Sequence, residues 1–138
     1  MRSRLWAQRL RAKLRRLGDR GVGSVEFAVL AVVVLALGFA IIQTGFYFHA
    51  KSVAQSAARQ GVEAGRQYNA GAGDGVAQAQ TYLARFGDSV RGASVSSGGS
   101  TAETIRITVR GHVATLVPGL TLDVAEHADA PVERVTAP

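Results

Sequence analysis

Glu26 is the residue whose type and position say most about chemistry in this 138-residue sequence. It directly precedes a run from Phe27 to Ala50 that contains no Asp, Glu, Lys or Arg. About 20 apolar residues in a helix suffice to cross the hydrocarbon core of a bilayer. A carboxylate at the edge of such a segment is costly unless a positive group pairs with it. The sequence therefore predicts that Glu26 has a cationic partner.

The other residue types that catalyse reactions or bind metals are not arranged to do so. His49, His112 and His127 are isolated in the sequence, and their spacing matches no metal site. The serines of residues 94–100 lie in a Gly/Ser loop without a nucleophile elbow, and the glycine-rich residues 71–75 lack the lysine of a phosphate-binding loop. Cysteine is absent, which excludes disulfides and cysteine-based metal sites. We expect no enzyme, no cofactor and no metal.

Positive charge is concentrated at the N-terminus. Residues 1–21 carry +7, from eight Lys/Arg and one acid, whereas the rest of the chain carries −1, from eight Lys/Arg and nine Asp/Glu. Basic residues beside a single apolar span hold that end in the cytoplasm, so the C-terminal part is expected on the far side of the membrane. Direct nucleic-acid binding is not expected, because a nucleic-acid binder carries its basic face on the folded part. A DNA-binding basic arm is a weaker alternative that leaves the apolar run unexplained.

The basic leader has two interpretations. Its apolar residues recur every three to four positions, which favours an amphipathic helix on an anionic membrane face, but a disordered anchor is equally consistent with the charge. The glycines of residues 18–23 predict a flexible break, where a protease could approach the backbone closely. A conventional secretory signal is disfavoured, because the apolar run is too long and ends in Tyr47, Phe48 and His49 rather than in small residues.

A single helix is predicted from about residue 25 to 67, with a transmembrane part over about 25–48. Its length would be about 60 Å at 1.5 Å per residue. Its second half carries a stripe of small residues spaced four apart, a spacing that lets helices approach closely. The stripe packs either on the protein's own outer domain or on a neighbouring subunit, and the sequence leaves both open. Its members are Ala50, Ala54, Ala57, Ala58, Gly61 and Gly65.

The C-terminal half predicts a short second helix followed by a small antiparallel sheet. Glycines in residues 69–75 predict a loop, and residues 76–86 an amphipathic helix with Gly87 as its C-cap. Alternating apolar residues then predict strands separated by Gly, Ser and Pro turns. The expected strands are 89–96, 104–109 continuing as 112–117, 120–128, and a fourth at 132–135. The fold class is therefore α+β, with a long N-terminal transmembrane and amphipathic helix, a short second helix and a sheet of three to four strands.

The start of the apolar run resembles the processing region of pilin-like precursors. A basic leader ends in Gly21, Glu26 is the fifth residue after it, Phe27 is aromatic, and an apolar helix follows. In particular, the segment is similar to the TadE-like family of minor pilins (pseudopilins) of tight-adherence (Tad/Flp, type IVc-like) pili. Residues 53–61 (VAQSAARQG) are similar to that family's Ala/Arg/Gly segment. The resemblance covers residues 20–65, about a third of the chain, and beyond them it is only architectural.

The resemblance implies cleavage between Gly21 and Val22 by a membrane prepilin peptidase. Cleavage removes the leader and creates an α-amine on Val22, which is cationic or partly so near neutral pH. In a bundle of such helices, Glu26 of one subunit could pair with this amine on a neighbour and so fix the axial register. Phe27 belongs to the same constellation. The implied partners are the peptidase, other pilin subunits, the inner-membrane assembly platform with its ATPase, and membrane lipid.

Two functions follow as hypotheses. The first is a minor pilin, held in the inner membrane and taking part in assembly of a Tad-type pilus for adhesion, surface colonisation or DNA uptake. The second is an unprocessed single-pass membrane protein whose outer domain binds a partner as an assembly scaffold. Both divide the chain into a leader (1–21), a long helix (22–68) and a small extracytoplasmic domain (69–138). They differ in whether the leader is present in the mature protein.

Overall fold

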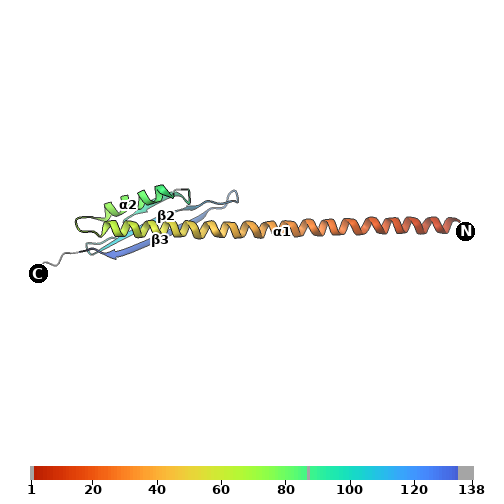
Figure 1. The fold of residues 1–138 in the computed structure, drawn as a ribbon, viewed down its shortest axis with the longest axis horizontal. Coiled ribbons are helices and arrows are strands. Elements are labelled where there is room, and N and C mark those ends of the chain that lie inside the picture. Colours follow the sequence, from red (N-terminus) through yellow and green to blue (C-terminus); the bar gives the residue numbers. More distant parts are fainter. Residues whose placement is uncertain (1, 87, 134–138) are drawn as a thin grey trace. The chain divides into compact units, whose positions relative to one another are not determined.

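The computed structural model describes residues 2–86 and 88–133, with side chains from Gly23 onward. Two helices precede three strands in the chain, which confirms the predicted α+β fold (Figure 1). The chain consists of two units, Met1–Ile41 and Ile42–Pro138. The elements are α1 (Arg2–Gly65), α2 (Ala72–Arg85), β1 (Val90–Ser96), β2 (Thr104–Val113) and β3 (Leu122–Pro131).

Helix α1 is longer than the sequence predicts. It begins at Arg2 rather than near residue 25, and it ends at Gly65. The predicted flexible break over residues 18–23 is wrong, because the backbone stays helical through these glycines. Each glycine costs about 1 kcal/mol relative to alanine in a helix, but the Arg, Leu and Ala residues around it are good helix formers, and proline is absent. The leader backbone is helical, as the amphipathic alternative requires.

Helix α2 also begins earlier than predicted, at Ala72 instead of residue 76. The glycine-rich segment was expected to be a loop, yet Asp74 stabilises a helix start within it. The carboxylate Oδ2 of Asp74 accepts the backbone N–H of Gly71 at 2.9 Å, and this interaction satisfies one of the free donors at the N-terminus of the helix. Phe86 follows the helix as its C-cap, and its N–H donates to the Leu83 carbonyl. Gly87, the expected C-cap, lies outside the described residues.

The three strands form one antiparallel sheet in the order β1-β2-β3. Prediction and structure differ at the end of β2, which stops at Val113 instead of continuing to residue 117. The reason is local, since the next residues give their backbone groups to Gln43 rather than to a neighbouring strand. The predicted fourth strand is not formed at residues 132–133, and residues 134–135 lie outside the described part of the chain.

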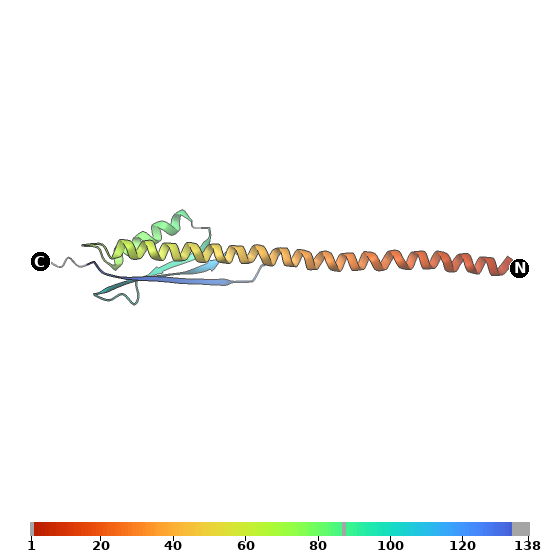
Figure 2. The same ribbon diagram turned by 60° about the horizontal axis from the view of Figure 1, so that its bottom comes forward.

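The core of the second unit lies between the two helices and one face of the sheet. The α2 helix runs beside the C-terminal part of α1, and the strands lie against both (Figures 1 and 2). Alternation along β2 buries Ile105, Ile107 and Val109, while the residues between them face outward. Ile107 lies under the crossing of the helices, because it is the neighbour of both Gly61 on α1 and Gly75 on α2. The core is thus closed by small residues that bring backbones together.

Candidate membrane and assembly interface

From Val25 to Leu37, helix α1 exposes its large apolar side chains. Within residues 23–86 and 88–133, Gly23–Gly65 is the one helical segment long and apolar enough to cross a membrane, and none of its most apolar 18 residues is buried within the chain. Monomeric soluble proteins rarely expose contiguous apolar surfaces of this kind. The surface must therefore be covered by lipid or by other helices. Its exposed large residues from 25 to 37 are Val25, Phe27, Val29, Leu30, Val32, Val33, Val34, Leu35 and Leu37.

Glu26 lies at the start of this apolar surface and is exposed, as is Phe27 beside it. The nearest sequence neighbours with a formal charge are Arg20 and Lys51. No ion pair joins Glu26 to any residue from 23 to 86 or from 88 to 133. A partner for this carboxylate must then come from the segment before Gly23 or from another molecule. Gly21 and Val22 lie within the helical backbone of α1.

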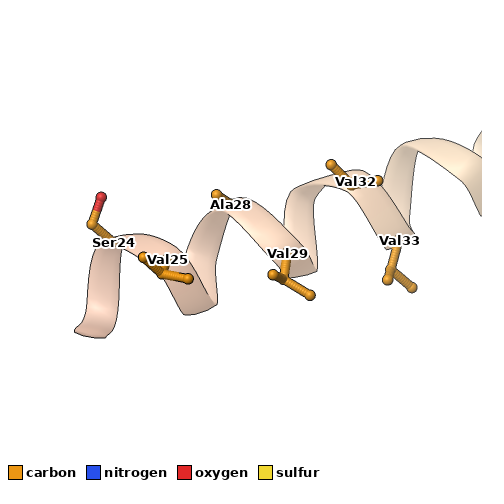
Figure 3. A pocket seen from close by; sticks show the side chains of 6 residues that line it. All are labelled: Ser24, Val25, Ala28, Val29, Val32 and Val33. Carbon is orange, nitrogen blue, oxygen red and sulfur yellow. The ribbon is translucent and has the colours of Figure 1, made fainter. Parts of the chain in front are cut away.

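One side of the helix around Glu26 forms a shallow apolar face. Figure 3 shows its six residues projecting from a single stretch of helix. They form two rows with a spacing of four, which places them on the same side of the helix. Ser24 and Ala28 are small, so another helix could approach closely at this end. Because one helix alone forms the face, it is a contact surface rather than an enclosed cavity. Its members are Ser24, Val25, Ala28, Val29, Val32 and Val33.

The small-residue stripe is buried inside the second unit. The four alanines have no exposed surface, and the two glycines are buried as well. A Cβ on Gly65 would lie 3.1 Å from both the Gly71 carbonyl oxygen and Ile105 Cγ2, so the sheet and the start of α2 cover this end. The stripe is therefore occupied by the protein's own domain. The six residues are Ala50, Ala54, Ala57, Ala58, Gly61 and Gly65.

The polar residues considered for chemistry lie apart on the surface. His112 Nδ1 is 2.7 Å from Asp123 Oδ1 on the outward face of the sheet, with both side chains largely exposed. His49 is exposed on α1, and His127 is exposed on β3. The Ser100 hydroxyl bonds both backbone groups of Arg106, so it has a structural role in the β1–β2 turn. Within residues 23–86 and 88–133, no three metal-ligating side chains gather at one place.

Gln43 is a positioning residue that the sequence reasoning missed. Its Nε2 donates to the Ala114 carbonyl at 3.3 Å, and its Oε1 accepts the Leu116 N–H at 2.9 Å. These two bonds tie the β2–β3 connection to α1. The signal was present in the sequence, since Gln43 is the one amide side chain between Phe27 and Ala50. A lone amide in an apolar run requires a partner, because an unsatisfied polar group there is costly.

A family match covers the residues of the apolar surface and of the small-residue stripe. The model of one protein family, described as TadE-like protein, matches residues 21–68. The matched segment begins at Gly21, includes Glu26 and the whole apolar surface, and ends just beyond α1. No curated protein and no solved structure matches the chain. The family match confirms the resemblance seen in the sequence: residues 21–68 of this chain form a TadE-like segment.

Proposed function

We propose that this protein is a minor pilin (pseudopilin) that takes part in assembly of a Tad-type pilus. The observation that carries the proposal is the TadE-like match over residues 21–68, which begins at Gly21 and includes Glu26 five residues later. A helix with exposed apolar side chains follows. Such a helix can lie in lipid before assembly and in a bundle of like helices afterwards. The role is structural and requires no catalytic residue.

Before assembly, the protein is held in the inner membrane by residues of about 25–48. The leader, with its charge of +7, stays in the cytoplasm, and the α+β domain lies on the other side. Lys51 is the first charged residue after the span. It pairs with Glu126 of β3 at 3.5 Å, which places the first ion pair of the outer domain just beyond the apolar run.

Prepilin peptidase cleaves between Gly21 and Val22 in this proposal. The backbone is helical at this point, whereas a protease needs an extended peptide in its active site. The helix must therefore unwind locally. Gly21 and Gly23 favour this, since each glycine weakens a helix by about 1 kcal/mol relative to alanine. The glycines do not break the helix, but they lower the cost of opening it at the cleavage site.

Cleavage supplies a cationic partner for Glu26. The new α-amine of Val22 is positive or partly so near neutral pH, and the leader's cations are gone. Inside a helix bundle, an unpaired carboxylate is strongly disfavoured, so pairing of Glu26 with the amine of a neighbour favours one axial register. The stripe from Ala50 to Gly65 is already buried. Subunit contacts along α1 are therefore made by its exposed apolar surface from Val25 onward, which includes the face of Figure 3.

The alternative is an unprocessed single-pass protein whose outer domain acts as an assembly scaffold. One observation favours it: the small-residue stripe packs within its own domain, which has a core of its own around Ile107 and Val109. A domain with its own core can present a surface to a partner without entering a fibre. In this case the leader stays attached, and it keeps the chain in the membrane.

Intact mass and N-terminal sequencing of the membrane-extracted protein test the proposal. With a co-expressed prepilin peptidase, we expect a start at Val22, and without the peptidase a start at Met1. Gly21→Leu should block cleavage, whereas Gly23→Leu, at a position open to solvent in the structure, is the matched control and should still be cut. A start at Met1 in both samples favours the scaffold alternative. A cut beyond Phe48 would reject both functions and indicate a secretory signal.

A further inference from the structure

The connection between β2 and β3 is an apolar loop. Residues 114–121 read ATLVPGLT and contain no charged side chain. Leu116, Val117 and Leu120 are 43%, 49% and 41% exposed. Three large apolar side chains on eight residues are unusual for a surface loop, which normally gathers polar residues. The loop therefore presents a small apolar surface of its own, separate from the long helix in sequence.

The shape of this loop is fixed by internal hydrogen bonds. The Thr115 hydroxyl donates to the Leu120 carbonyl at 2.9 Å, and the Leu120 N–H donates to the Val117 carbonyl at 3.2 Å. Gly119 follows Pro118 with a φ of +82°, a conformation that favours glycine. These bonds fix the turn, and the side chains of Leu116, Val117 and Leu120 stay partly exposed on its surface. We call this apolar surface of residues 114–121 the knob.

The knob lies at the level of the apolar run. Both bonds of Gln43 go to this loop, at Ala114 and Leu116. Gln43 precedes Lys51, the first charge after the run, by eight residues, or about 12 Å along a helix. Tyr47 and Phe48 lie between them with ring centroids 5.8 Å apart, and tyrosine is enriched where a membrane meets water. Gln43 is then inside the membrane's outer boundary, and so is the loop bonded to it.

We propose that residues 114–121 enter the outer interfacial layer of the phospholipid bilayer. They give the outer domain a lipid contact in addition to the membrane span of α1. Gln43 holds the loop there. Its amide needs partners inside the apolar run, and the loop's backbone supplies them. Leu116, Val117 and Leu120 gain an apolar environment in lipid. The contact sets the height of the outer domain on the membrane. This inference rests on the placement of α1 in the membrane, but not on cleavage of the leader or on a role in a pilus.

Depth-dependent quenching tests the inference with the full chain in vesicles of phosphatidylcholine and phosphatidylglycerol. The chain has no cysteine, so Leu116→Cys carries a unique environment-sensitive fluorophore. Leu37→Cys, near the middle of the span, reports whether α1 is inserted. Ala102→Cys is exposed at the other end of β2 and reports the aqueous phase. Quenchers are lipids spin-labelled at shallow or deep positions, and aqueous iodide.

We expect the Leu116 probe to be quenched most by shallow lipid labels, the Leu37 probe by deep labels, and the Ala102 probe by iodide. Equal iodide quenching at positions 116 and 102, with lipid quenching kept at position 37, would overturn the inference and leave the membrane span intact. Loss of lipid quenching at position 37 would instead reject the span itself. Shielding of position 116 that increases with the protein-to-lipid ratio would assign the loop to a second copy of the chain, which also overturns it.

The Gln43 tether is tested in the Leu116→Cys background. Gln43→Leu removes both hydrogen bonds, and we expect lipid quenching at position 116 to fall by about two-fold or more. Gln60→Leu is the matched control, because Gln60 is an exposed glutamine on the same helix, 17 residues after Gln43. A fall of equal size in both variants would mean that α1 is disturbed in general and that Gln43 does not position the loop.

Discussion

Gly61 on α1 and Gly75 on α2 approach so closely that a Cβ on either would lie 2.7 Å from the other's carbonyl oxygen. The obstacle in each case is backbone, which cannot turn aside as a flexible side chain can. Gly61→Ala and Gly75→Ala should each lower the free energy of unfolding by about 1–3 kcal/mol, since overpacking outweighs alanine's better helix propensity. Urea unfolding of the full chain in detergent micelles, followed by near-ultraviolet circular dichroism, measures the change.

Gly73→Ala is the matched control for this crossing. Gly73 lies on the same helix as Gly75, but a Cβ there meets nothing within 4 Å. We expect it to leave stability unchanged or to raise it by about 0.5–1 kcal/mol, because alanine favours a helix over glycine. Equal losses in Gly73→Ala and Gly75→Ala would mean that the helix crossing is looser than the structure has it.

Ile107 is the side chain on which both helices rest, and it has no exposed surface. Ile107→Ala should cost about 2–5 kcal/mol, from lost apolar burial and from the cavity left behind, whereas Ile107→Val should cost about 0.5–1.5 kcal/mol. The same unfolding experiment measures both. An alanine variant no less stable than the valine variant would show that the helices close over the gap, and that the core is not as tightly packed as these contacts imply.

Asp74 gives a third prediction, at the start of α2. Asp74→Ala removes the acceptor of the Gly71 N–H and should lower stability by about 0.5–2 kcal/mol, the range for loss of a helix cap. Asp123→Ala is the control, because its pair with His112 is largely exposed and such pairs contribute about 0–1 kcal/mol. If Asp123 proved the more costly of the two, the cap would not be what starts the helix at Ala72.

The fold class could be predicted because its main signals extend over many residues. The apolar run up to Ala50 and the alternation around Ile107 each indicate an element by themselves. The boundaries could not be predicted, because single hydrogen bonds decide them. Asp74 starts α2 inside a glycine-rich segment, and Gln43 ends β2 at Val113 by taking the next backbone groups. None of these hydrogen bonds corresponds to a periodic pattern of residues in the sequence.

The candidate site also has one feature that the sequence indicates and one that it does not. The position of Glu26 relative to Gly21 is a matter of spacing, so the sequence alone indicates it. The sequence alone does not indicate what the small-residue stripe packs against, because the spacing of Ala54 and Gly61 suits any close neighbour. Only the placement of Gly75 and Ile107 shows that the neighbour belongs to the same chain. The sequence is consistent with packing on the same chain and with packing on a neighbouring subunit, and it does not distinguish the two.

Glu26→Gln should abolish pilus assembly without changing the single subunit. Glu26 is exposed and makes no ion pair with residues from 23 to 86 or 88 to 133, so stability should change by less than about 0.5 kcal/mol. Insertion and cleavage should also persist. Glu63→Gln is the control on the same helix; it removes only an exposed i,i+3 pair with Arg66 and should assemble normally. Shear-and-pellet fractionation of cells, with immunoblotting, measures assembly.

The register hypothesis needs a sharper test than loss of assembly, because Val22 and Glu26 are four residues apart. On one helix that spacing also allows pairing within a single chain, and an internal pair would fix no register. Zero-length carbodiimide cross-linking of fibres built from mixed ¹⁴N and ¹⁵N subunits separates the two cases. If subunits pair with one another, Val22–Glu26 cross-linked peptides of mixed isotope should form in assembled material and disappear in Glu26→Gln. Cross-links of one isotope only would show that Glu26 neutralises its own N-terminus, and that another contact must set the stacking.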